Sequence, residues 1–230
     1  MRDLPLLTEA ECRKALAEVH ALEAHWLRRH PFAPFFTLGP ASYLDAPAGS
    51  APYEAAAAVG NPVLAEHFGW LYARLDAALA EALGGPVAPA PRFALPGFHV
   101  FGFHAAFEEP VASVHTDQQY GLLAWDPADE PDFGRPVSFT LPVALPAVGG
   151  GLDVWDLHLA QLEPLSPPER ARLIAAQEPT RHAYTVGTLV LHDGHLVHRI
   201  GHTPGLVAGD ERVTLQGHAV PTRAGWRYYW

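Results

Sequence analysis

The spacing of apolar residues changes character near Pro91. Before it, apolar residues recur every three or four positions, as at Ala15, Val19, Leu22 and Trp26. That spacing places their side chains on one face of a helix. After Pro91 the apolar residues gather in short runs separated by turn residues, as is typical of strands. The pattern therefore predicts a helical N-terminal part followed by a part built mainly of β-strands.

Two helices are expected in the first part. Residues 8–11, Thr-Glu-Ala-Glu, form a capping-box pattern that can begin the first helix. A second helix is expected from Pro62 to Leu83, with Asn61 as its N-cap and Gly84-Gly85 at its end. The proline-rich stretch from 31 to 60 is expected to be loop.

The second part predicts an antiparallel sheet structure, closed or doubled into a sandwich. Ser166-Pro167-Pro168-Glu169 is expected to begin a helix between the later strands. The expected strands are Phe98–Phe103, Val111–His115, Val137–Val143, Leu152–Leu157, Thr185–His192 and Arg212–Val220. We expect a single domain over 1–230, in which a helical part, 1–90, packs on a sheet core, 91–230.

Composition narrows the class of protein. Of 230 residues, 49% are hydrophobic and 17% charged, which suffices for a sizeable core. The net charge is -10, and the absence of a basic stripe argues against a nucleic-acid partner. No apolar run is long enough to cross a bilayer. The single cysteine, Cys12, permits no intrachain disulfide, and the first residues do not resemble a signal peptide, so a cytoplasmic location is expected.

The first chemical signal is His115-Thr116-Asp117. On an extended chain, residues two positions apart point to the same side. One imidazole and one carboxylate placed in this way suit a divalent metal. A histidine from elsewhere would complete a two-histidine, one-carboxylate site with open coordination positions, which is the arrangement that oxygen-activating iron(II) requires.

Four histidines compete to be that third ligand: His192, His195, His198 and His202. They surround a tight-turn signal at Asp193-Gly194, which lies between two apolar runs. Because the turn breaks the alternation of a simple strand, spacing alone does not choose among them. The same cluster could instead form a structural zinc site.

A further signal lies in the last predicted strand. Arg212, Thr214, Gln216 and His218 alternate with apolar residues and therefore share one strand face. An arginine guanidinium can bind a carboxylate through two parallel hydrogen bonds. Considered alone, Arg212 would more often be a surface ion-pair partner.

Taken together, His115-Thr116-Asp117, His198 and Arg212-Val213-Thr214 resemble the pattern of iron(II)- and 2-oxoglutarate-dependent oxygenases. Two other stretches also resemble that family, namely the run from 187 to 194 before the distal histidine and Gly149-Gly150-Gly151-Leu152 at a strand entry. The resemblance covers residues 98 to 220. It implies a double-stranded β-helix, or jelly roll, flanked by helices.

The resemblance also assigns roles to residues. It implies that His115, Asp117 and His198 hold Fe(II), that Arg212 binds the distal carboxylate of 2-oxoglutarate, and that Thr214 assists it. O2 would be the second co-substrate. The family's position of the distal histidine and its spacing to Arg212 favour His198 over the other candidates. His192 departs from the pattern, since an aromatic residue is expected before Asp193-Gly194.

The function that this implies is a dioxygenase that hydroxylates a small molecule, such as an amino acid or a natural-product intermediate, and releases succinate and CO2. Related halogenating enzymes lack the carboxylate ligand, so Asp117 favours hydroxylation. Gln118, Gln119, Tyr120 and Trp125 could contact the substrate or could simply pack. The alternatives are a cupin-type dioxygenase or isomerase that does not use 2-oxoglutarate and a non-catalytic zinc-binding module. The chain is expected to be a monomer or a homodimer.

Overall fold

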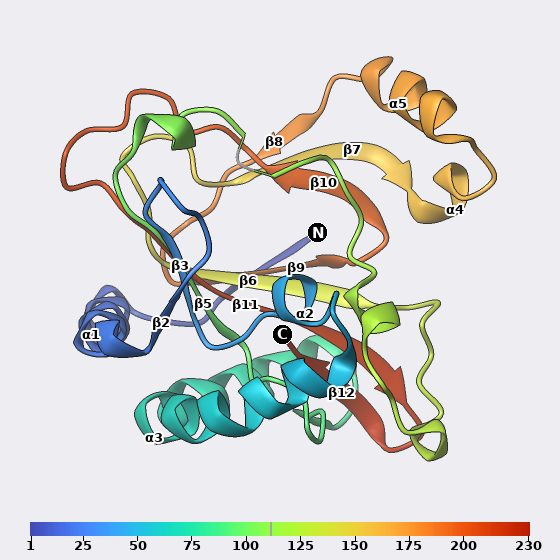
Figure 1. Cartoon of the computed structure of the whole chain (residues 1–230), viewed down its shortest axis with the longest axis horizontal. Helices are drawn as coiled ribbons and strands as arrows, with labels where there is room; N and C mark the ends of the chain where they lie inside the picture. The colour runs from blue at the N-terminus through green and yellow to red at the C-terminus, as the bar shows by residue number, and fades with distance from the viewer. Residues whose placement is uncertain (111) are drawn as a thin grey trace.

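The computed structural model describes residues 1–110 and 112–230 and shows two facing β-sheets flanked by helices (Figure 1). The large sheet has nine strands, with the order β1-β9-β6-β11-β5-β3-β2; β12 pairs with β11, and β4 pairs with β12. Its strands are β1 (Arg2–Pro5), β2 (Trp26–Arg28), β3 (Phe35–Leu38), β4 (Val87–Pro89), β5 (Gly97–Phe101), β6 (Val137–Ala144), β9 (Thr188–Asp193), β11 (Arg212–Thr222) and β12 (Gly225–Tyr229).

The small sheet consists of three strands in the order β10-β7-β8. They are β7 (Leu152–His158), β8 (Thr180–His182) and β10 (Leu196–Ile200). The chain passes from the large sheet to the small one at the predicted Asp193-Gly194 turn, which links β9 to β10. All pairings are antiparallel except that of β12 with β4. Two facing, mainly antiparallel sheets confirm the predicted jelly roll.

The helices flank the two sheets. They are α1 (Glu9–Ala21), α2 (Ser42–Asp45), α3 (Ser50–Leu83), α4 (Leu159–Leu162) and α5 (Pro167–Ala175), with short 3-10 turns at Glu23–His25, Ala105–Phe107, Gln119–Leu122 and Pro127–Asp129. Figure 1 shows α1 and α3 on the side of the large sheet that faces away from β7, β8 and β10. Among the described residues, no helix combines the length and the apolar character that a bilayer span requires.

The two faces of the large sheet differ in chemistry because side chains alternate along each strand. On the outer face, Phe98, Leu141 and Leu215 pack with Phe68 and Leu75 of α3 in the main hydrophobic core. Each such buried side chain contributes about 1.5–3 kcal/mol of transfer free energy. The inner face carries His99, Ser138, Thr140, His192, Arg212, Thr214 and His218, all of them buried. These polar side chains of the large sheet therefore face the space between the sheets, while the main apolar core lies under the helices.

The predicted helix starts at Thr8 and Ser166 are confirmed, since both carry complete capping boxes. The second helix differs from the prediction because α3 begins at Ser50 and runs through Pro62. Asn61 caps no helix; its side chain donates to the Phe93 carbonyl at 2.8 Å and accepts from the Leu95 amide at 2.9 Å. Half of the stretch expected to be loop is thus helical.

The N-terminal part is not wholly helical, because β1, β2 and β3 are strands of the large sheet. The strand predicted over Val111–His115 includes Val111, which lies outside the described residues. Within the rest of that run, His115 forms only an isolated bridge with His198. The aromatic C-terminal tail is β12 plus Trp230, whose side chain is fully buried within the chain itself.

Candidate metal centre

Backbone hydrogen bonds bring the three predicted ligands together. His115 and His198 form an antiparallel bridge in which each amide donates to the other residue's carbonyl at 2.9 Å. Two residues further along, the Asp117 amide donates to the Gly194 carbonyl at 2.7 Å. The loop that carries His115 and Asp117 is therefore fixed against β10 and the turn before it.

The ligand atoms of these side chains converge. His115 Nε2 lies 3.7 Å from Asp117 Oδ1, and His198 Nε2 lies 3.5 Å from Asp117 Oδ2. Three ligand atoms, one from each residue, lie within 4.8 Å of one another. Among residues 1–110 and 112–230 this is the one group of histidine, cysteine or carboxylate side chains with that geometry.

Hydrogen bonds orient both imidazoles for coordination. His115 Nδ1 lies 2.7 Å from the Ser113 carbonyl, and His198 Nδ1 lies 2.8 Å from the Leu196 carbonyl. A carbonyl can only accept, so each Nδ1 carries the proton and each Nε2 keeps a free lone pair. This is the arrangement in which metal-binding histidines are usually held.

The carboxylate of Asp117 is buried, and each of its oxygens accepts one hydrogen bond. Ser138 Oγ donates to Oδ2 at 2.6 Å, and Gln119 Nε2 donates to Oδ1 at 2.9 Å. His218 Nδ1 lies 3.0 Å from Ser138 Oγ and so supports the serine. Burial raises the pKa of Asp117, but the surrounding histidines, His198 foremost, outweigh it and hold that pKa well below its ordinary value.

Burial also keeps His198 neutral, since it lowers the pKa of that imidazole to about 4. Burial likewise lowers the pKa of His192 and of His218. At neutral pH His198 therefore offers a neutral imidazole beside the Asp117 carboxylate, and imidazole with carboxylate is a donor set suited to a divalent cation.

The rival histidines occupy other places. His192 lies beside the site, with its ring centroid 4.6 Å from that of His198. His195 points elsewhere, since its Nε2 lies 2.9 Å from the Tyr120 hydroxyl. His202 is exposed on the loop after β10. The structure thus gathers His115, Asp117 and His198 and leaves the other candidates out of the group.

A cavity of about 430 Å³ opens beside the three ligands, which belong to its lining. Its floor is the polar inner face of the large sheet, including Thr140 and Gln216. One wall is apolar and includes Phe35, Phe101 and Ile200. A volume of this size suits a small molecule.

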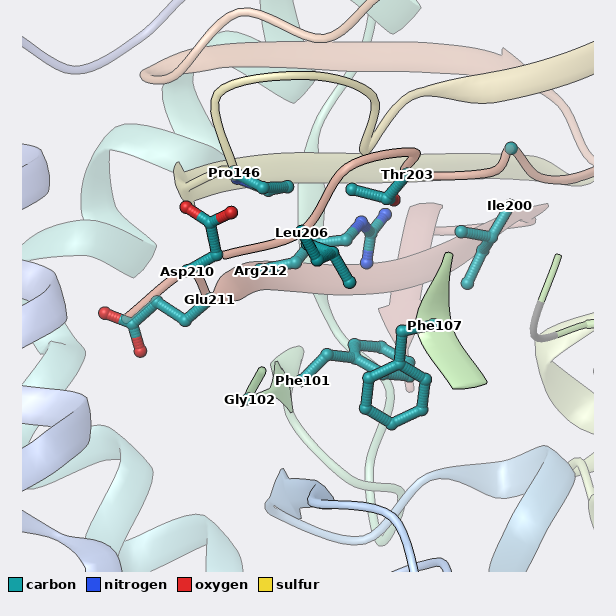
Figure 2. A pocket seen from close by; sticks show the side chains of 11 residues that line it. Phe101, Gly102, Phe107, Pro146, Ile200, Thr203, Leu206, Asp210, Glu211 and Arg212 are labelled. Atoms are coloured by element: carbon teal, nitrogen blue, oxygen red, sulfur yellow. The ribbon is translucent and has the colours of Figure 1, made fainter. Parts of the chain in front are cut away.

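Arg212 lies close to this cavity. It lines a smaller hollow of about 20 Å³, which shares Phe101, Phe107 and Ile200 with the cavity wall. Figure 2 shows the Arg212 side chain in this hollow, with the rings of Phe101 and Phe107 below it in the view.

The guanidinium of Arg212 is buried and only partly paired. Its Nε donates to the Gly150 carbonyl at 3.1 Å, and one terminal nitrogen donates to Thr214 Oγ1 at 3.2 Å. The other terminal nitrogen is buried without a hydrogen-bond partner, and no carboxylate of the described residues forms an ion pair with this arginine. A buried cation in this state is suited to an anionic ligand.

The four residues after Asp117 that could contact the substrate have different positions in the structure. Gln119 lines the cavity and donates to Asp117. Gln118 is exposed, and its amide donates to Thr116. Tyr120 and Trp125 pack in a satellite hydrophobic cluster, where Tyr120 stacks on Phe133. Sequence reasoning missed Ser138; the alternation of β6, which turns Ser138 and Thr140 to the inner face, was the signal that could have found it.

Solved structures of other proteins share this fold. A dioxygenase of N-substituted L-amino acids from Burkholderia ambifaria, solved with α-ketoglutarate, superposes with a TM-score of 0.58 at 17% identity, over 99% of this chain and 85% of that one. SnoN, an α-ketoglutarate-dependent non-haem epimerase of nogalamycin biosynthesis, gives 0.52 at 14% identity, over 95% and 78%. HygX from Streptomyces hygroscopicus, with nickel and 2-oxoglutarate bound, gives 0.51 at 15% identity, over 94% and 80%.

No protein-family model matches the sequence, and no curated protein matches it. The structural likenesses therefore establish the fold. The chain has the jelly-roll fold of 2-oxoglutarate-dependent oxygenases, which confirms the fold that the sequence resemblance implied.

Proposed function

We propose that this protein is an Fe(II)- and 2-oxoglutarate-dependent dioxygenase that hydroxylates a small molecule. The observation that carries the proposal is the pairing of two sites within one fold. One is the converging group of His115, Asp117 and His198, and the other is the buried, incompletely paired guanidinium of Arg212. A keto acid needs both, because one end chelates a metal and the other end is a carboxylate.

The residues present fit the metal. Both Nε2 atoms carry free lone pairs, since each Nδ1 is engaged with a backbone carbonyl. Three protein ligands beside an open cavity leave coordination positions for co-substrate, as catalytic sites do, whereas a structural zinc site is closed by four ligands. This supports an iron site over the zinc-binding module.

The residues also fit 2-oxoglutarate. The unpaired terminal nitrogen of Arg212 can donate to a carboxylate, and Thr214 Oγ1, which already accepts from Arg212, can donate its proton to the same group. This supports the 2-oxoglutarate-dependent function over a cupin-type enzyme, because an enzyme that does not use 2-oxoglutarate does not need an arginine to bind its carboxylate.

When bound, Fe(II) and 2-oxoglutarate supply the oxidising chemistry, in which O2 and 2-oxoglutarate yield succinate, CO2 and one oxygen atom for the substrate. The protein's own residues position the ligands and the co-substrate and limit the access of water. Ser138 and Gln119 fix the orientation of the Asp117 carboxylate. Arg212 orients the co-substrate through its far end, and the apolar wall of the cavity limits the access of water.

The proposal is tested by following succinate formation when the purified protein is supplied with iron(II), 2-oxoglutarate and O2. With ascorbate added to supply the two electrons that substrate would otherwise give, slow turnover without substrate is expected, so we expect succinate from the wild type and none from His198→Ala. His195→Ala is the matched control, because His195 lies outside the ligand group. Succinate formation that persists in His198→Ala would contradict the proposal.

A further inference from the structure

The 430 Å³ cavity beside the three metal ligands is lined by almost no charged side chains. Its described residues include no arginine, lysine or glutamate, and its one aspartate is Asp117, which belongs to the metal site. A substrate that enters this cavity thus meets no cationic side chain with a permanent charge.

Hydrogen bonds fix the rings of two further lining histidines, His30 and His99. His30 Nδ1 accepts backbone N–H bonds from Phe32 at 3.2 Å and Ala33 at 2.8 Å, so the ring proton is on Nε2. His99 is 3% exposed and hydrogen-bonded to the Tyr43 hydroxyl, and burial lowers its pKa well below the ordinary value.

Nearby cations are already engaged. Arg29 binds Asp45 through two bonds of 2.7 and 2.6 Å. Arg199 is paired with the buried Asp153. Arg212 lines the adjoining small hollow, where the proposed function assigns it to 2-oxoglutarate.

The cavity offers apolar surface and neutral hydrogen-bonding groups instead. Phe35 and Phe101 stack with a centroid separation of 4.2 Å, and Phe107 meets Phe101 edge-on at 5.1 Å. The cavity is also lined by Tyr43, whose hydroxyl is hydrogen-bonded to His99, and by the amide of Gln216. An apolar body suits the aromatic wall, and neutral polar groups on it suit the amide and the hydroxyl.

We infer that the substrate is an uncharged small molecule with an apolar, ring-sized body, and not a free amino acid or another carboxylate. With the metal occupied by 2-oxoglutarate, a substrate carboxylate in this cavity would lose its hydration without gaining a cationic side chain, which is unfavourable. This inference rests on the proposed function, since it takes Arg212 to be occupied by 2-oxoglutarate.

The test uses matched probes on the full chain loaded with Zn(II), a diamagnetic substitute for iron, and saturating 2-oxoglutarate. The probes have a phenyl, indolyl or cyclohexyl ring on a three-carbon chain that ends in a carboxamide, a carboxylate or an amine. Ligand-observed NMR measures their binding. We expect at least one amide to bind about tenfold or more tightly than its carboxylate and amine partners, because only the charged forms lose hydration without compensation.

Leu44 provides the control, since it lines the cavity and is 37% exposed, so a polar replacement keeps the fold. Leu44→Lys adds a cation and should remove the discrimination against the carboxylate, whereas Leu44→Gln should leave it unchanged. Carboxylates that bind the wild type as well as amides do, a preference for amines, or no binding by any probe would overturn the inference. Formation of the iron(II)–2-oxoglutarate complex is measured separately, and its failure to form would instead refute the proposed function.

Discussion

Replacing Arg212 by methionine shows whether this arginine serves to bind 2-oxoglutarate or to stabilise the fold. The guanidinium is 6% exposed, makes two hydrogen bonds within the chain and leaves one terminal nitrogen unpaired. If its purpose is to hold a carboxylate, Arg212→Met should abolish most of the affinity for 2-oxoglutarate. The apoprotein, however, should not lose much stability, because a buried and unpaired charge is itself unfavourable.

The magnitudes follow from the contacts. Two hydrogen bonds to a charged carboxylate contribute about 1.5–3 kcal/mol each. Their loss weakens 2-oxoglutarate binding by about 100-fold or more, at 1.4 kcal/mol for each tenfold change. In the apoprotein the freed Gly150 carbonyl costs stability while removal of the buried charge restores it, so we expect a net change within about 2 kcal/mol.

The assay is thermal unfolding with zinc(II) present, with and without 2-oxoglutarate. At a co-substrate concentration of 100 times Kd, the wild type should gain about 2.7 kcal/mol. For a chain of this size that gain raises Tm by about 5–10 °C. Arg212→Met should gain no more than about 2 °C at the same concentration, because that concentration is no higher than the variant's Kd.

The matched control is Arg199→Met, which removes one of the two arginines paired with the buried Asp153. That variant should be less stable than the wild type and yet keep the full rise in Tm with 2-oxoglutarate. The reasoning is refuted if Arg212→Met keeps the wild-type response to 2-oxoglutarate. It is also refuted if the variant unfolds without co-substrate, since Arg212 would then be structural.

Three further predictions concern the metal and the core. Chelation by EDTA should remove the metal and leave the far-UV circular dichroism largely unchanged, whereas unfolding on chelation would indicate a structural zinc site. Ser138→Ala should weaken metal affinity by about 10- to 100-fold in a competitive chelator titration, because the Asp117 carboxylate loses its hydroxyl donor; unchanged affinity would show that the serine does not position the ligand. Gly97→Ala should lower the free energy of unfolding by about 1–3 kcal/mol in urea, since its Cβ would lie 2.2 Å from the Trp230 ring. Gly69→Ala, in open space on α3, should instead be neutral or stabilising, and equal effects at both sites would contradict the packing argument.

Local patterns in the sequence predict much of this fold. The alternation in the second half predicts β5, β6, β7, β9 and β11 within a few residues of their bounds. The capping boxes predict the starts of α1 and α5. These elements follow from short-range rules, because side-chain periodicity and end-capping need no knowledge of the rest of the chain.

The errors arose where long-range contacts decide the structure. Asn61-Pro62 has the pattern of a helix start, but the Asn61 side chain is engaged by the backbone near Phe93 and α3 continues through the proline. Strands β1 and β3 are short and gain their partners from β9 and β5, far along the chain. Neither contact is visible from local spacing.

The candidate site likewise has a part that the sequence predicts and a part that depends on long-range contacts. The order of His115, Asp117, His198 and Arg212 along the chain predicted a group that the structure brings together, apart from Arg212 in its own hollow. The support from Ser138 depends on the register between β6 and β11, which pairs Ser138 with His218. Such register is a property of the folded sheet, so no motif announces it.

The most direct test of the account is an anaerobic titration of the apoprotein with iron(II) and 2-oxoglutarate, followed in the visible spectrum. A keto acid chelated to iron(II) gives a weak charge-transfer band, which we predict for the wild type, weakened in Arg212→Met and absent in His198→Ala. Iron binding without the band would contradict the role of 2-oxoglutarate, and failure to bind iron at all would contradict the metal site formed by His115, Asp117 and His198.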